Sequence, residues 1–107
     1  MRIVWAPLAL DRVEEAVDYI ARHRPAAAVR YAENLFARVE LLAKSPTQGR
    51  VVPEIRRQNI REIQHQGYRV IYRVDDKKVV ILTVRHSRRR LDHEELRGCF
   101  DRRPGMK

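Results

Sequence analysis

The part of the sequence that decides the fold is residues 60–86, which read IREIQHQGYRVIYRVDDKKVVILTVRH. Branched and aromatic residues alternate there with polar ones, which is the pattern of β-strands that bury one face. Two short polar stretches, Gln66-Gly67 and Asp75-Asp76-Lys77, interrupt the pattern and are typical of hairpin turns. The stretch therefore predicts three antiparallel strands, at Ile60–His65, Tyr68–Val74 and residues 79–86.

The two faces of these predicted strands differ in character, because successive side chains of a strand point to opposite sides. In the middle strand one face carries Tyr68, Val70, Tyr72 and Val74, and the other carries Arg69, Ile71 and Arg73. In the last strand, Val80, Leu82, Val84 and His86 alternate with Val79, Ile81, Thr83 and Arg85. One face of the sheet is thus apolar enough to receive helices, and the other is mixed and carries arginines.

The N-terminal half predicts one short strand and two helices. Residues 2–5 favour a strand that ends at Ala6-Pro7, and residues 8–23 have helical spacing. The apolar stripe of this first helix is Leu10, Val13, Val17 and Ile20. Pro25 suits the first turn of a second helix. The stripe of that helix is Ala28, Ala32, Leu35, Val39 and Leu42, widened by Phe36 and Ala43. Such an αα-hairpin needs another surface on which to bury its stripes.

This order of elements predicts an α+β fold, in which a two-helix hairpin packs on a small, mostly antiparallel four-stranded sheet (β-α-α-β-β-β). A short C-terminal helix or tail follows, for which Leu91, Leu96 and Phe100 supply the apolar positions. The 107 residues suit one domain. We expect a single domain over residues 1–107, with its core in about residues 2–92 and a tail at 93–107.

Composition narrows the class of protein. The chain has 23 Lys and Arg against 14 Asp and Glu, a formal net charge of +9, so we expect it to attract polyanions or an acidic protein. Its one cysteine, Cys99, allows no internal disulfide, and neither a membrane span nor a signal peptide is recognisable. We therefore expect a cytoplasmic protein. No clustered Cys/His pattern or glycine-rich phosphate loop is present, so no metal and no cofactor are expected.

Arginine dominates the basic residues of the second half, and its planar guanidinium suits bidentate binding of phosphate or carboxylate. In a simple hairpin, Arg69 lies opposite the end of the last strand, so that the cations gather at one rim of the sheet. We interpret them as an anion-binding patch; the alternative is an ordinary solvated face. His86 is either a contact or proton-transfer residue of that patch or a histidine packed at the sheet edge. The predicted target- or anion-binding residues are Arg61, Arg69, Arg73, Arg85, His86, Arg88, Arg89 and Arg90.

Several stretches, in this order, resemble the RelE/ParE superfamily of small bacterial toxins, and the resemblance is closer to ParE. They are Ile3-Val4-Trp5-Ala6-Pro7-Leu8-Ala9-Leu10, Asp18-Tyr19-Ile20-Ala21, Ile60-Arg61-Glu62-Ile63, Gly67-Tyr68-Arg69-Val70-Ile71-Tyr72-Arg73-Val74 and Val84-Arg85-His86-Ser87-Arg88-Arg89. The resemblance covers about residues 2–92. It implies the toxin component of a type II toxin–antitoxin system, of the kind linked to growth inhibition and plasmid stabilisation. The implied partner is a cognate acidic antitoxin, which the +9 charge would attract.

The superfamily contains two activities. RelE-type members cut mRNA on the ribosome, and the resemblance places two of their arginines on Arg69 and on Arg89 or its neighbours, with His86 or His93 as a substitute proton-transfer group. However, the strand that bears their lysines has none here, and their C-terminal tyrosine position falls near Glu95. ParE-type members inhibit DNA gyrase without chemistry of their own, and this is the predicted function. The alternatives are a RelE-like endoribonuclease and a non-toxic basic nucleic-acid-binding module.

Overall fold

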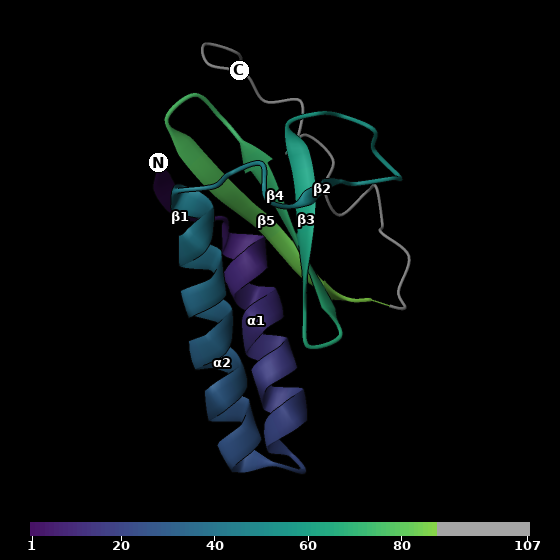
Figure 1. The fold of residues 1–107 in the computed structure, drawn as a ribbon. Coiled ribbons are helices and arrows are strands. Elements are labelled where there is room, and N and C mark those ends of the chain that lie inside the picture. The colour runs from purple at the N-terminus through teal and green to yellow at the C-terminus, as the bar shows by residue number, and fades with distance from the viewer. Residues whose placement is uncertain (88–107) are drawn as a thin grey trace.

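A two-helix hairpin covers one face of a five-stranded sheet in the computed structural model, which describes residues 1–87 (Figure 1). The helices are α1 (Pro7–Ala21) and α2 (Pro25–Glu40), and a short 3-10 turn, η1 (Leu41–Ala43), follows. The strands are β1 (Arg2–Trp5), β2 (Arg50–Val51), β3 (Ile60–His65), β4 (Tyr68–Val74) and β5 (Lys78–His86). The α+β class is therefore confirmed. The predicted C-terminal helix lies outside the described residues.

The strand order is β1-β5-β4-β3-β2, in which β1 is parallel to β5 and the other neighbours are antiparallel. The prediction of four strands was wrong by one strand, β2. Its two residues pair with Arg61 and Glu62 of β3. A strand this short has no alternation of its own, so the sequence pattern could not reveal it.

A register shift in the middle of β5 changes which of its residues face the helices. Tyr72 pairs with Ile81 but Ile71 pairs with Thr83, so Leu82 has no partner on β4. One extra residue of this kind is a β-bulge, and it reverses the alternation beyond it. The predicted faces of this strand were therefore wrong after the bulge. Val84 packs with Val79 and Ile81 under the helices, whereas Val80 and Leu82 lie in the core on the other face.

The larger core lies between the helices and the sheet. From α1 it receives Ala9, Val13 and Ala16, and from α2 it receives Tyr31, Leu35 and Val39. The predicted stripes were wrong at Leu10, which is 46% exposed, and at Phe36, which is 40% exposed. Alanines on the buried side let α1 lie close to the sheet, and this rotates the bulkier Leu10 outward.

A second core lies on the opposite face of the sheet. It consists of Val52, Ile60, Ile71, Val80 and Leu82, with Ile55 packed against them. Val52 and Ile55 belong to the connection between β2 and β3, residues 52–59, which we call the 52–59 segment. In Figure 1 this connection forms the teal loop that projects beside β2 and β3. The segment therefore helps to bury the face of the sheet that carries the predicted arginines.

The local geometry agrees with the sequence at the helix starts and at one hairpin. Pro7 and Pro25 occupy the first positions of their helices. Gln66 and Gly67 have φ values of 48° and 84°, as the two central residues of a hairpin turn with a right-handed twist require. Within the described part of the chain, no helix is both long and apolar enough to cross a membrane.

Candidate functional site

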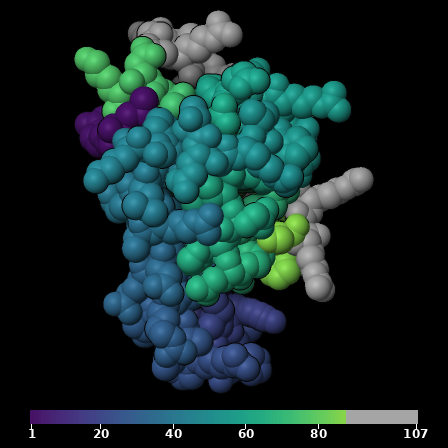
Figure 2. All heavy atoms as spheres, viewed as in Figure 1, coloured from purple at the N-terminus to yellow at the C-terminus, as the bar shows by residue number. Residues whose placement is uncertain are grey.

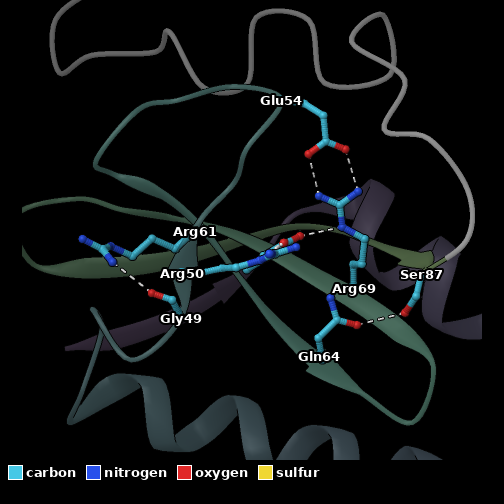
Figure 3. Close-up of polar contacts among 8 residues, drawn as sticks. Gly49, Arg50, Glu54, Arg61, Gln64, Arg69 and Ser87 are labelled. Atoms are coloured by element: carbon cyan, nitrogen blue, oxygen red, sulfur yellow. Dashed lines mark hydrogen bonds and ion pairs between the residues drawn. The ribbon is translucent and has the colours of Figure 1, made fainter.

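Arg69 is the centre of a buried ion-pair cluster on the face of the sheet opposite the helices. Its side chain is 7% exposed and lies between two carboxylates (Figure 3). Nε donates to Glu62 Oε1 at 2.5 Å, while Nη1 and Nη2 donate to the two oxygens of Glu54 at 2.7 and 2.9 Å. Glu54 comes from the 52–59 segment, so one guanidinium joins β3, β4 and that segment.

A fourth residue completes this cluster. Arg50 of β2 donates through Nε to Glu62 Oε2 at 2.6 Å, and the Glu62 side chain is only 1% exposed. We call Arg50, Glu54, Glu62 and Arg69 the ion-pair cluster; it contains two cations and two anions. The hydrogen bonds that Arg69 donates, first to Glu54 and then to Glu62, raise its pKa, although its burial opposes them. The two arginines and the two glutamates of the cluster balance in formal charge.

Arg73 forms a separate ion pair at the other end of β4. Its Nε and Nη2 donate to the two oxygens of Asp75 at 2.8 and 2.9 Å, and its side chain is 9% exposed. It pairs in register with Ile60 and Val80, whereas Arg69 pairs with Gln64 and Arg85. The two arginines share a face but lie four residues apart along the strand.

Arg61 lies on the opposite face, because its partner in β4 is Tyr72, which packs under the helices. Its guanidinium donates to the backbone oxygens of Gln58 at 3.0 Å and of Gly49 at 2.9 Å. Figure 3 shows it pointing away from Arg69 and towards Gly49. Arg61 thus connects the loops on either side of β2 and β3.

Arg85 and His86 lie where β5 ends. The register places Arg85 directly opposite Arg69, as the hairpin predicted. His86 pairs with Tyr68, and their rings are in edge contact at 5.4 Å. Both residues line an open groove of about 460 Å³, whose other wall includes Arg12 and Tyr19 of α1.

Of the predicted site residues, the structure brings Arg69 and Arg85 together and places Arg61 and Arg73 elsewhere. Arg88, Arg89 and Arg90 lie outside the described residues. The sequence reasoning missed Glu54, Glu62 and Arg50, which hold Arg69. A signal existed for Glu62, since a lone carboxylate in a β-rich stretch on the same side as an arginine is a candidate ion-pair partner.

Among the described residues, Tyr31 Oη, His65 Nε2 and Thr83 Oγ1 are buried and form no hydrogen bond. Burial lowers the pKa of His65, so that its neutral form is favoured. Burial also raises the pKa of the Tyr31 hydroxyl.

No group of three or more His, Cys, Asp or Glu side chains that could hold a metal gathers within residues 1–87.

The model of the ParE toxin of type II toxin–antitoxin systems, parDE, matches residues 3–91. The chain belongs to the ParE toxin family. The fold of the chain is similar to that of a chain in the structure of the chromosomal ParDE toxin–antitoxin system from P. aeruginosa. The two are 19% identical and superpose with a TM-score of 0.69 over 80% of this chain and 95% of that one. The fold is also similar to that of a chain in the toxin–antitoxin complex RelBE2 from Mycobacterium tuberculosis, with 22% identity and a TM-score of 0.52 over 79% and 95%. The sequence matches no curated protein.

Proposed function

We propose that this ParE-family toxin inhibits DNA gyrase and thereby blocks replication, without catalysing a reaction of its own. The observation that carries the proposal is the state of Arg69. This is the position that the RelE-type ribonucleases would use to hold a phosphate, and here both of its terminal nitrogens donate to Glu54. The Arg69 guanidinium is therefore already occupied, because it binds both oxygens of the Glu54 carboxylate in the same bidentate way in which arginine binds a phosphate.

The surroundings of Arg69 also disfavour a phosphate. An incoming phosphate would meet the charges of Glu54 and Glu62, and it would have to displace Glu54 to reach the terminal nitrogens of Arg69. Transition-state stabilisation in a nuclease needs donors that are aimed in advance at the developing charge. The absence of lysine from Ile60–His65 removes further donors of this kind. These features support inhibition by binding over mRNA cleavage.

We further propose that a cognate acidic antitoxin binds and silences the chain in the cytoplasm. The net charge of +9 would accelerate the capture of an acidic partner. Both structural neighbours are described as toxin–antitoxin assemblies, which supports a similar arrangement here. Expression alone should arrest growth, and co-expression of a small acidic protein encoded next to the gene should relieve the arrest.

The function is tested by adding the purified chain to two reactions, supercoiling by gyrase and translation in vitro. We expect loss of supercoiling, with accumulation of cleaved gyrase–DNA complexes, and full-length translation products. Messages truncated in the ribosomal A site, with supercoiling unchanged, would instead establish the RelE-like activity. Absence of both effects, together with normal growth on expression, would favour the non-toxic binding module.

A further inference from the structure

A set of cationic side chains gathers at the end of the molecule where β1 begins and β4 turns into β5. The register places Arg2 directly beside Lys78, and Arg2 N donates to Lys77 O at 3.2 Å. The turn η1 packs against β1 and β5, so Lys44, which follows it, lies at the same end (Figure 1). We call Arg2, Lys44, Lys77 and Lys78 the basic end.

The charges of the basic end are not neutralised within the described chain. None of its side chains forms a hydrogen bond or an ion pair with a described residue, and all but the partly buried Lys78 are exposed. In the adjoining turn Asp75 is already bound by Arg73, which leaves Asp76 and, before η1, Glu40 as the exposed carboxylates nearest in sequence. Figure 2 shows the green atoms of this turn projecting from the surface beside the purple N-terminal residues. Cations therefore outnumber the exposed carboxylates at this end.

An open groove of about 480 Å³ adjoins the basic end. It is lined by Leu41, Lys44, Ser45, Thr47 and Gln48. Leu41 is 55% exposed, so a large apolar side chain lies in water next to a lysine and to hydroxyl and amide groups. A partner that covers this groove would bury Leu41 and gain the hydrophobic free energy of that burial.

This combination of groups indicates the kind of partner. A phosphate backbone is bound by charged and polar donors, and it offers no apolar group for Leu41. A second copy of the chain has the same net charge of +9 and would be repelled. An acidic peptide with an apolar side chain fits both features, because its carboxylates can meet the flexible ammonium groups while its apolar side chain covers Leu41.

We propose that the basic end and the groove beside Leu41 bind an acidic segment of a partner protein, with an apolar side chain of that segment packed on Leu41. The inference rests on the proposed silencing by an acidic antitoxin, because it makes the basic end the surface that captures this antitoxin. Arg69 and Arg73 are unsuited to that role, since both are buried and bind carboxylates of their own chain.

The test is fluorescence anisotropy of a labelled peptide of about 12 residues that alternates glutamate with serine and has one central leucine, at about 50 and about 500 mM salt. The charge variant is Lys44→Gln with Lys77→Gln, and the anchor variant is Leu41→Ser. The matched control is Arg22→Gln with Arg24→Gln, which removes two charges at the turn between α1 and α2, at the opposite end of the molecule in Figure 1. All the substituted side chains are exposed, so no buried contact is lost.

We expect the charge variant to bind the peptide about fivefold more weakly at the lower salt concentration and nearly as well as the wild type at the higher one. The anchor variant should lose about fivefold at both concentrations. Its loss should vanish with a peptide in which serine replaces the leucine. The control should lose about twofold at most.

Three results would overturn the proposal. Equal losses in the charge variant and the control would show that binding follows net charge alone. Undiminished binding of the leucine peptide by the anchor variant would show that Leu41 is no contact. Tighter binding of a DNA duplex of the same total charge would show that the surface suits nucleic acid.

The inference and the proposed function can fail separately. If the peptide results are as expected but the small acidic protein encoded next to the gene does not relieve the growth arrest, the silencing is refuted and the peptide-binding surface stands. If that protein relieves the arrest equally well in the wild type, the charge variant and the anchor variant, and the variants bind the peptide like the wild type, the surface is refuted and the silencing stands.

Discussion

Arg69 is predicted from the sequence to bind an anionic target, but in the structure it is buried and binds two carboxylates of its own chain. Its guanidinium binds Glu54, whose side chain is 32% exposed, and Glu62, whose side chain is 1% exposed. The two ion pairs should therefore differ in energy, because a charge that has lost its partner in the interior cannot recover water. Glu62 is buried between the buried Arg69 and the largely exposed Arg50, whereas solvent can partly replace Glu54.

Glu62→Gln should lower the free energy of unfolding by about 1.5–3 kcal/mol, since it removes the buried charged acceptor that Arg69 and Arg50 share. Glu54→Gln should cost about 1 kcal/mol, because that carboxylate is partly solvated. Urea unfolding at neutral pH measures both, with Glu33→Gln on the exposed side of α2 as the control. Equal costs for Glu54 and Glu62 would contradict the difference in burial.

His65 should make the stability depend on pH in a defined direction. Burial lowers its pKa in the folded chain, so the unfolded chain binds a proton more readily near pH 6.5. The contribution of the neutral histidine is present above that pH and is lost as the pH falls towards the folded pKa. We expect a decline in the free energy of unfolding from pH 7 to about pH 5.5. His65→Gln should flatten that decline, and His23→Gln, at an exposed position, should leave it unchanged.

At the scale of the elements, the approach of β2 to β3 depends on a residue without a side chain. A Cβ on Gly49 would overlap Glu62 O and lie 2.6 Å from the Tyr72 hydroxyl. That hydroxyl accepts from Gly49 N at 2.9 Å and donates to Pro46 O at 2.8 Å, so it cannot move aside without losing both bonds. The loop before β2 is thus fixed at β4 by a tyrosine hydroxyl.

Gly49→Ala should therefore lower the free energy of unfolding by about 1–3 kcal/mol, as overpacking against backbone does. The comparison is Gly67→Ala, where an added Cβ meets no atom within 4 Å and only the φ of 84° opposes it. We expect that change to cost about 1–2 kcal/mol. If Tyr72→Phe rescued Gly49→Ala, the overlap with the hydroxyl would be the main cause; if it did not, the overlap with Glu62 O would be.

The elements also show what the sequence can predict. The bounds of β3 and β4 agree with the prediction because the turn residues Gln66-Gly67 and Asp75-Asp76-Lys77 mark where the two strands end. The bulge at Leu82 could not be predicted, since every residue from Val79 to Leu82 is apolar and leaves the phase of the alternation undefined. The ion-pair cluster could not be predicted either, because Glu54 and Arg50 come from a segment without periodicity. The sequence identified Arg69 but not the carboxylates that bind it.

At the scale of the whole molecule, the charge should control the speed of association more than the lifetime of a complex. The net charge of +9 would attract the proposed acidic antitoxin from a distance, and salt screens such attraction within about 10 Å at 0.1 M. Stopped-flow mixing should show an association rate that falls about tenfold or more between about 50 and 500 mM salt. The dissociation rate should change much less. A salt effect confined to dissociation would indicate that short-range ion pairs dominate.

Among the described residues, the bulge in β5 separates a part that pairs with both β1 and β4 from a part that pairs with β4 alone. Residues before it lie between β1 and β4, and Ala6 closes this arrangement by donating to Ile81 O at 2.9 Å. Among the described residues, no strand pairs with β5 on the β1 side after Ile81. Ser87 donates to Gly67 O at 2.8 Å, so by alternation the Arg85 N–H faces β4 and the Val84 N–H faces away from it.

Native-state hydrogen exchange should therefore be slow at Ile81 and Arg85 and faster at Val84. Equal protection at Val84 and Arg85 would contradict this pattern. If the pattern holds, β5 consists of two parts that meet at Leu82. The part before Leu82 is held between β1 and β4 and opens rarely. The part after Leu82 opens together with the hairpin of β3 and β4. A single inserted residue would then act as the hinge between the scaffold and the end of the sheet where Arg85 and His86 lie.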